Sequence, residues 1–210
     1  ELCAFSGRRV VEAGCGTGRL TRLLLEAGAT VAASDAAAGM LEEAGAHLAE
    51  AVASGRLTLQ VADARELPEP SHSADVGVAG WVYGHFTGWK PDAWEAPIAA
   101  AVGELERVVR PGGDVLILET LGTGTGLGAP APPHERLGGY YAWLEDRGYE
   151  RHTLSTDYLF GSVDEAAEVL GFFFGDALVG RIREHGWARV PEWTGLWHKR
   201  LQPLDELPRE

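Results

Sequence analysis

The feature that most constrains the fold of this 210-residue sequence is a glycine-rich turn near its start. An apolar run ending in Glu12 leads into three alternating glycines, Gly14, Gly16 and Gly18. A segment with apolar residues at helical spacing follows at once, which predicts a strand, a tight turn and a helix in that order. The apolar face of this helix is predicted to comprise Leu20, Leu23, Leu24 and Ala27. Glycine suits a turn that needs positive φ and close approach of a ligand to the backbone, so a bound ligand is predicted here.

The spacing of the glycines narrows the choice of ligand. Dinucleotide-binding turns read G-x-G-x-x-G or G-x-G-x-x-A. Gly14 and Gly16 fit this pattern, but Arg19 stands at the third small position. A phosphate loop of the type G-x-x-x-x-G-K-[ST] is excluded because no Lys follows the glycines. A nicotinamide-dependent dehydrogenase with a degenerate fingerprint stays open as an alternative.

Composition excludes several classes of protein. The formal net charge of -13 disfavours nucleic acid as the main partner, because phosphate binding needs a basic surface. Cys3 and Cys15 are too few for a disulfide framework or a zinc site, so no metal is predicted. No run is long and apolar enough to cross a membrane, and no signal peptide is visible. A cytoplasmic protein without a membrane partner is therefore expected.

The length fits one domain over residues 1–210. Because the chain begins only a few residues before the first predicted strand, an N-terminal lid segment is expected to be missing. Residues 120–148 and 161–186 are interpreted as variable elements on the substrate side or at an interface. A monomer or a homodimer is expected.

Strand and helix patterns alternate through most of the chain. This alternation predicts an α/β fold, with a mostly parallel sheet and helices on both faces. Residues 122–133 are predicted to form an exposed loop or a substrate-side flap. Later elements are a strand over residues 151–160, one long helix from Ser162 to about Ile182, and a last strand over residues 193–199. The run from Phe172 to Phe174 in that helix is expected to be buried against the sheet or a partner subunit.

Five segments together resemble one family. They are residues 11–18 (Val-Glu-Ala-Gly-Cys-Gly-Thr-Gly), Asp35 with Met40, residues 61–64 (Val-Ala-Asp-Ala), Gly80-Trp81, and Arg110-Pro111-Gly112-Gly113. This arrangement resembles that of class I S-adenosylmethionine-dependent methyltransferases. The resemblance implies a Rossmann-like sheet of seven strands whose last strand is antiparallel and lies between the fifth and sixth. It also implies S-adenosyl-L-methionine as cofactor.

The resemblance assigns a role to each motif residue. Gly14, Gly16 and Gly18 would line the methionine part of the cofactor, with Glu12 beside them. Asp35 would bind the ribose hydroxyls, and its place about 20 residues after the glycine turn fits that role. The remaining implied contacts are Met40 at the adenine ring, Asp63 and Ala64 at the adenine amino group, and Gly80 and Trp81 at the methyl-donating end.

The residues by themselves leave structural alternatives for these assignments. Glu12 suits an N-terminal partner of a neighbouring helix, and Asp35 suits a helix cap. Met40 lies on an apolar helix face, which is typical of core residues. Asp63 suits a turn before Arg65.

The reacting group of the acceptor is expected beyond the fourth strand, because open parallel sheets bind ligands at the carboxyl ends of their strands. His85 and Tyr83 are the candidate catalytic residues there, with His85 as a base near working pH. Glu119, after the fifth strand, is a second candidate base. A histidine that only caps a loop is the alternative for His85. Aromatic residues over 81–89 and 140–143 are interpreted as core or as the wall of an acceptor pocket.

Three functions follow from these observations. The leading hypothesis is transfer of a methyl group to an oxygen or nitrogen atom of a small molecule. The alternatives are the nicotinamide-dependent oxidoreductase and a non-catalytic binding protein that retains the methyltransferase fold.

Overall fold

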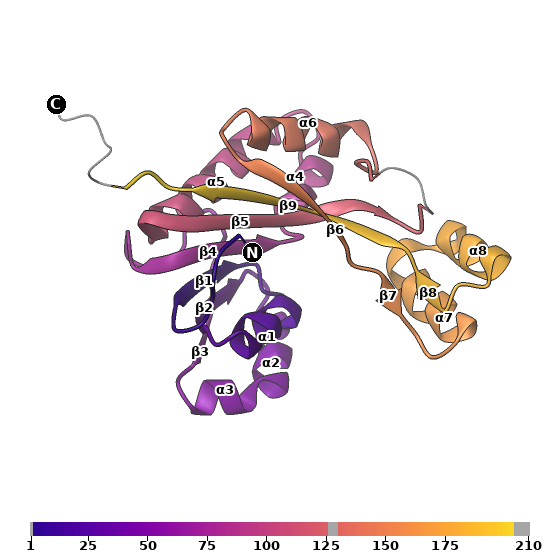
Figure 1. The fold of residues 1–210 in the computed structure, drawn as a ribbon, viewed down its shortest axis with the longest axis horizontal. Helices are drawn as coiled ribbons and strands as arrows, with labels where there is room; N and C mark the ends of the chain where they lie inside the picture. The colour runs from indigo at the N-terminus through magenta and orange to yellow at the C-terminus, as the bar shows by residue number, and fades with distance from the viewer. Residues whose placement is uncertain (1, 126–129, 204–210) are drawn as a thin grey trace.

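The computed structural model describes residues 2–125 and 130–203, so part of the predicted 122–133 loop, residues 126–129, lies outside the described residues. The main sheet is built from β1 (Arg9–Ala13), β2 (Thr30–Asp35), β3 (Leu57–Val61), β4 (Ala74–Gly80), β5 (Val109–Thr123), β6 (Glu150–Ser155) and β9 (Glu192–Arg200). Its strand order is β3-β2-β1-β4-β5-β9-β6 (Figure 1). The strands from β3 to β5 pair in parallel, whereas β9 is antiparallel to both β5 and β6. The predicted seven-stranded, mostly parallel sheet is therefore confirmed.

Helices cover both faces of this sheet. They are α1 (Arg19–Glu26), α2 (Ala38–His47), α3 (Ala49–Ala53), α4 (Gly84–Trp89), α5 (Glu95–Val108) and α6 (Glu135–Glu145). Figure 1 shows α5 and α6 on one side and α1 to α3 on the other. Val10 and Val11 belong to different core clusters, because successive side chains of a strand point to opposite faces. The apolar side chains of the central strands thus serve two cores at once.

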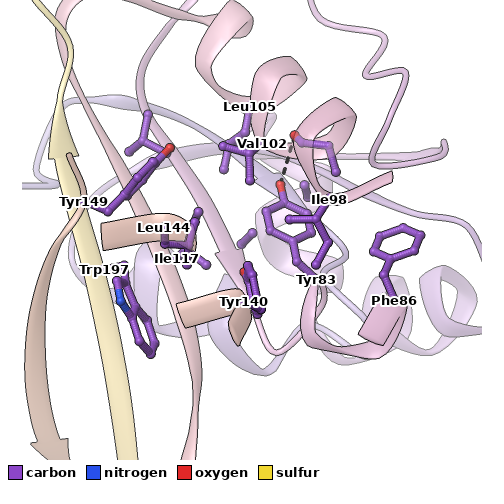
Figure 2. Packing of buried hydrophobic residues seen from close by; sticks show 14 of the residues in the cluster. Tyr83, Phe86, Ile98, Val102, Leu105, Ile117, Tyr140, Leu144, Tyr149 and Trp197 are labelled. Carbon is purple, nitrogen blue, oxygen red and sulfur yellow. Dashed lines mark hydrogen bonds between the residues drawn. The ribbon is translucent and has the colours of Figure 1, made fainter. Parts of the chain in front are cut away.

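The core beneath α5 and α6 contains many aromatic side chains (Figure 2). Tyr140 and Tyr141 of α6 are buried there, and the ring centres of Tyr141 and Trp197 lie 4.4 Å apart. Trp143 is also buried in this cluster. The core interpretation of the aromatic residues Tyr140, Tyr141 and Trp143 is therefore confirmed, and the alternative that they form an acceptor-pocket wall is wrong.

The predicted buried face of the first helix is partly wrong. Leu24 is buried and Leu20 is half-buried, but Leu23 and Ala27 are exposed. Thr21 and Leu25 are buried in their place. The helix is thus rotated relative to the prediction, because Thr21 must face the sheet to reach Glu12 of β1, as described below.

Residues 158–190 form a small unit beside the main sheet, hereafter the satellite unit. It comprises β7 (Tyr158–Leu159), α7 (Val163–Phe174), α8 (Asp176–His185) and β8 (Arg189–Val190). The β7 and β8 strands pair with each other, and Leu170, Leu178 and Ile182 contribute to a core of the unit's own. Figure 1 shows the unit beyond the end of β6 and β9.

The satellite unit corrects three predictions. The expected strand over 151–160 is two strands, β6 and β7, in different sheets. The expected single helix to Ile182 is two helices, because Gly175 has φ +77 and ends α7. The predicted cap of α7 is confirmed, since Ser162 Oγ accepts a hydrogen bond from the Glu165 amide. Phe172, Phe173 and Phe174 are exposed rather than buried against the sheet.

None of the helices within the described residues combines the length and the apolar character that crossing a membrane requires.

A buried carboxylate ties together three strands at the sheet edge opposite the glycine turn. Asp114 of β5 is fully buried, and its oxygens lie 3.1 Å from Arg8 Nη1 and 3.0 Å from His198 Nε2. Arg200 Nη1 lies 3.6 Å away. Asp114 thereby links β5 to the start of β1 and to β9.

We expect Asp114→Ala to lower the free energy of unfolding by about 2 kcal/mol, because it removes a fully buried carboxylate that pairs with Arg8 and His198. Urea unfolding measures this change. The control is Glu26→Ala, which breaks an exposed pair with Arg22 on α1 and should cost less than about 0.5 kcal/mol. Equal effects of the two substitutions would contradict this account of Asp114.

Candidate cofactor site

The glycine turn between β1 and α1 presents bare backbone, as the sequence predicts. Gly14 and Gly16 have φ of +71° and +53°, which favours glycine. A Cβ on Gly14 would collide with Val82, whereas a Cβ on Gly16 would meet no atom within 4 Å. Open space therefore lies against the backbone of Gly16.

Gly18 is glycine for a different reason. It has φ +86, and a Cβ there would come within 2.9 Å of Leu48 Cδ1 and 3.4 Å of Ala44 Cβ. Gly18 thus allows the start of α1 to pack against α2. It does not line the cavity described below, which corrects its expected place beside the ligand.

Asp35 joins the end of β2 to the glycine turn. Its Oδ2 accepts a hydrogen bond of 2.9 Å from the Gly16 amide, and its Oδ1 accepts one of 2.9 Å from the Ala37 amide. The contact follows from the parallel pairing of β1 with β2, which places the carboxyl ends of both strands at one edge of the sheet. The helix-cap alternative for Asp35 is wrong, because Ala37 is the N-cap of α2 and no side chain caps that helix. Asp35 instead organises the turn before α2 and faces the cavity.

A cavity of about 710 Å³ lies over these strand ends. It brings together most of the residues predicted for the site. Those lining it are Glu12, Gly14, Gly16, Asp35, Met40, Asp63, Ala64, Gly80, Trp81 and His85. Met40 is 45% exposed, so its apolar side chain is available to a ligand rather than in the core.

Glu12 is buried at the base of this cavity, with 1% of its surface exposed. Its Oε2 accepts a hydrogen bond of 2.7 Å from Thr21 Oγ1 of α1. Burial raises the pKa of Glu12 to about 7, although the Thr21 hydroxyl opposes this shift. No Lys or Arg within the described residues lies within ion-pair distance of it. A cationic ligand would therefore meet an uncompensated carboxylate here.

Asp63 pairs with Arg65 across its own turn. Asp63 Oδ1 accepts hydrogen bonds from the Arg65 amide and from Arg65 Nε, and Oδ2 accepts one from Nη2. Hydrogen bonding from the guanidinium lowers the pKa of Asp63 to about 2. The turn predicted as the alternative is thus present, and the same carboxylate also faces the cavity.

The two candidate catalytic residues lie in different surroundings. Tyr83 is fully buried, and its hydroxyl donates to the Ala101 carbonyl at 3.4 Å (Figure 2). Burial raises the pKa of Tyr83 well above its usual value. Tyr83 is therefore a core residue outside the cavity, which corrects its predicted place. His85 is exposed at the cavity wall and stacks on Trp89, with ring centres 5.5 Å apart.

Several lining residues were not predicted as site residues. Arg19 is the most informative of them, since its guanidinium lies 5.3 Å from the Trp81 ring centre and 5.4 Å from that of Tyr158. Tyr158 belongs to the satellite unit, so this contact places the unit beside the cavity. Trp81 has φ +57, an unusual value for a bulky side chain that is typical of functional sites. Arg65 also lines the cavity. The signal that the sequence offered for these two arginines was their closeness to motif residues: Arg19 follows Gly18, and Arg65 lies two positions after Asp63.

Comparison with known proteins identifies the class to which this fold and cavity belong. Residues 11–117 match the family model described as "Methyltransferase domain". Because the match covers half of the chain, the chain belongs to the methyltransferase domain family. It is a class I S-adenosylmethionine-dependent methyltransferase by family and fold, and S-adenosyl-L-methionine is the cofactor of this class. This membership decides against the nicotinamide-dependent alternative.

Two named relatives match the first part of the chain. A malonyl-[acyl-carrier protein] O-methyltransferase from Serratia marcescens is 34% identical over 119 residues, which are 57% of this chain and 40% of the relative. A demethylmenaquinone methyltransferase from Symbiobacterium thermophilum is 31% identical over 118 residues, or 54% of this chain and 43% of the relative. The chain thus spans less than half the length of these curated relatives.

Solved structures share the whole fold at low identity. YcgJ from Bacillus subtilis has a TM-score of 0.60 and 16% identity, covering 95% of this chain and 94% of that one. The [4+2]-cyclase SpnF has a TM-score of 0.58 and 18% identity, covering 94% and 76%. Since one of these proteins is named as a cyclase, the fold alone does not assign the reaction.

The raised pKa of Glu12 predicts a pH-dependent stability. The folded chain holds this proton more tightly than the unfolded chain, whose pKa is near 4.5, so stability falls as pH rises from about 4.5 to 7. Glu12→Gln removes this titration. As the pH rises from 5 to 8, the free energy of unfolding of the variant should therefore increase by about 2 kcal/mol relative to that of the unsubstituted chain. Urea unfolding at both pH values measures it, with the exposed Glu42→Gln as control. A pH-independent difference would contradict the prediction.

Proposed function

We propose that the chain transfers a methyl group from S-adenosyl-L-methionine to an oxygen or nitrogen atom of a small molecule. The observation that carries this proposal is the union, in one cavity, of the bare Gly16 backbone with the Glu12 and Asp35 carboxylates. The cofactor supplies a methyl carbon already activated by a sulfonium leaving group. The two relatives named above carry the names of a malonyl-[acyl-carrier protein] and of demethylmenaquinone as acceptors, and neither of these is a nucleic acid.

We assign groups of cavity residues to different parts of S-adenosyl-L-methionine. Gly14 and Gly16 would contact the methionine portion, and Glu12 would attract its ammonium and sulfonium charges. Asp35 has accepting capacity beyond its two amide bonds and would take the ribose hydroxyls. The other proposed contacts are Met40, Asp63 and Ala64 around the adenine, and Gly80 and Trp81 at the methyl group.

The chain's contribution to the reaction would be mainly positional. In-line displacement needs the acceptor held against the methyl carbon and water kept out. Trp81, Phe86 and Trp89 supply apolar surface on that side of the cavity. His85, which lines the cavity, would accept a proton from an oxygen or nitrogen nucleophile.

We also propose that residues 1–210 act as one methyltransferase domain. The first strand, β1, and the last, β9, are parts of the same sheet, so no cut in the sequence separates two independent cores. The satellite unit returns to that sheet through β9 and contacts the cavity through Tyr158 and Arg19.

The alternative is a non-catalytic or differently catalytic protein of the same fold, and SpnF supports keeping it. The two functions are separated by following formation of S-adenosylhomocysteine with a panel of acceptors. Cofactor binding without any such product across the panel would favour the alternative.

Asp35→Ala tests the cofactor site directly. We expect it to weaken binding of S-adenosylhomocysteine about 100-fold, because two hydrogen bonds to a charged acceptor are lost and the glycine turn loses its anchor. Isothermal titration calorimetry measures the affinity. The control is Asp164→Ala, which removes the same charge from an exposed position on α7. Unchanged affinity in Asp35→Ala would remove the proposed ribose contact.

A further inference from the structure

A second cavity of about 310 Å³ adjoins the cofactor cavity. The two share Trp81, His85 and Trp89, so they meet where the methyl group is proposed to lie. The second cavity continues from there toward Glu119 of β5 and His134 at the start of α6. Under the proposed function, on which this inference rests, it is the space available to the acceptor.

Glu119 is a buried carboxylate in the wall of this second cavity. Only 4% of its surface is exposed. Its Oε1 accepts hydrogen bonds from the Gly84 amide at 2.9 Å and from the Tyr140 hydroxyl at 3.5 Å. Within the described residues no Lys, Arg or His comes within ion-pair distance of Glu119.

The other groups around this carboxylate do not compensate its charge. Tyr83 and Tyr140 pack near Glu119, and burial raises the pKa of both hydroxyls, so they stay neutral. Among the residues that the structure describes, the lining of the second cavity contains no Lys or Arg, and its titratable groups besides Glu119 are His85 and His134. His134 Nδ1 accepts a hydrogen bond from the Leu137 amide, which requires an unprotonated Nδ1. An anionic ligand would therefore be repelled, while a cation would neutralise a buried charge.

The rest of the lining suits an apolar body beside that cation. Trp81 and Trp89 offer indole rings, and Leu137 adds aliphatic surface. The face of an indole ring attracts a cation, and it also packs well against another aromatic ring. The cavity thus combines one buried carboxylate with aromatic walls.

We propose that the second cavity binds an acceptor with a primary or secondary amine attached to an aromatic or other apolar group, and that Glu119 is its ionic partner. The bound ammonium gives one proton to Glu119. The freed nitrogen lone pair then forms a bond to the methyl carbon while the carbon–sulfur bond breaks and sulfur retains the electron pair. The products are the N-methylated ammonium ion and the neutral thioether of S-adenosylhomocysteine. Burial raises the pKa of Glu119 to about 7, which allows it to hold that proton near neutral pH.

Glu119 has a competing structural role, because its carboxylate anchors the Gly84 amide at the start of α4 (Gly84–Trp89). Glu119→Gln separates the two roles. The amide oxygen of Gln can still accept from Gly84, whereas the negative charge is gone. If the role of Glu119 is purely structural, the substitution should lower the binding affinity for charged and neutral ligands equally. If the role is ionic, only the affinity for cations should fall.

The test measures binding of phenethylamine, 2-phenylethanol and phenylacetate to the chain saturated with S-adenosylhomocysteine, by calorimetry or tryptophan fluorescence. We expect the amine to bind at least about 10-fold more tightly than the alcohol and the carboxylate not to bind. Glu119→Gln should weaken the amine about 30-fold and leave the alcohol within 2-fold. The control is Glu95→Gln, an exposed carboxylate in the first turn of α5, which should change neither.

The outcomes distinguish this inference from the proposed function. Failure to bind S-adenosylhomocysteine would remove the proposed function itself. Intact binding of S-adenosylhomocysteine with equal or absent binding of all three probes would overturn only the amine assignment. Tighter binding of phenylacetate than of phenethylamine would also overturn it. The comparison of probes on the unsubstituted chain needs no variant, so it stands even if Glu119→Gln does not fold.

Discussion

The contact between Asp35 and the Gly16 amide is the interaction on which the cofactor site depends. It fixes the turn from the neighbouring strand, together with the hydrogen bonds that the Gly14 and Cys15 amides donate to the Ser34 carbonyl. Parallel pairing makes this possible, because the carboxyl ends of β1 and β2 lie side by side. The cavity, the acids around it and the entry of α1 are all placed by the same geometry.

Two buried carboxylates, Glu12 and Glu119, lie at this edge of the sheet without cationic partners in the described residues. Burial raises the pKa of each to about 7, so both reduce stability at neutral pH. Asp114, at the opposite edge, is buried among Arg8, His198 and Arg200. The two ends of the sheet therefore differ: the buried carboxylate at the Asp114 end is compensated by cationic side chains, whereas those at the end with the candidate cofactor cavity are not.

Two pairs of residues that are close in sequence show that a prediction can be right for one residue and wrong for its neighbour. Tyr83 and His85 are two positions apart, and both were predicted to be catalytic. The segment turns into α4 directly after Tyr83, which sends Tyr83 into the core and leaves His85 at the cavity wall. Similarly, Gly16 faces the cavity while Gly18 faces Leu48, although the motif treats both glycines alike.

The sequence alone determined the alternation of strands and helices up to β5, the mostly parallel sheet, the cofactor class and most of the predicted site residues that line the cavity. These depend on local periodicity and on a motif whose glycines and acids follow strand ends. Tertiary structure alone decided the break at Gly175, the exposure of Phe172 to Phe174, and the burial of Tyr83 and Glu119. It also decided that Arg19 meets Tyr158, 139 positions further along the chain (158 minus 19). The physical reason is that burial and long-range contacts depend on how elements pack, which no local pattern encodes.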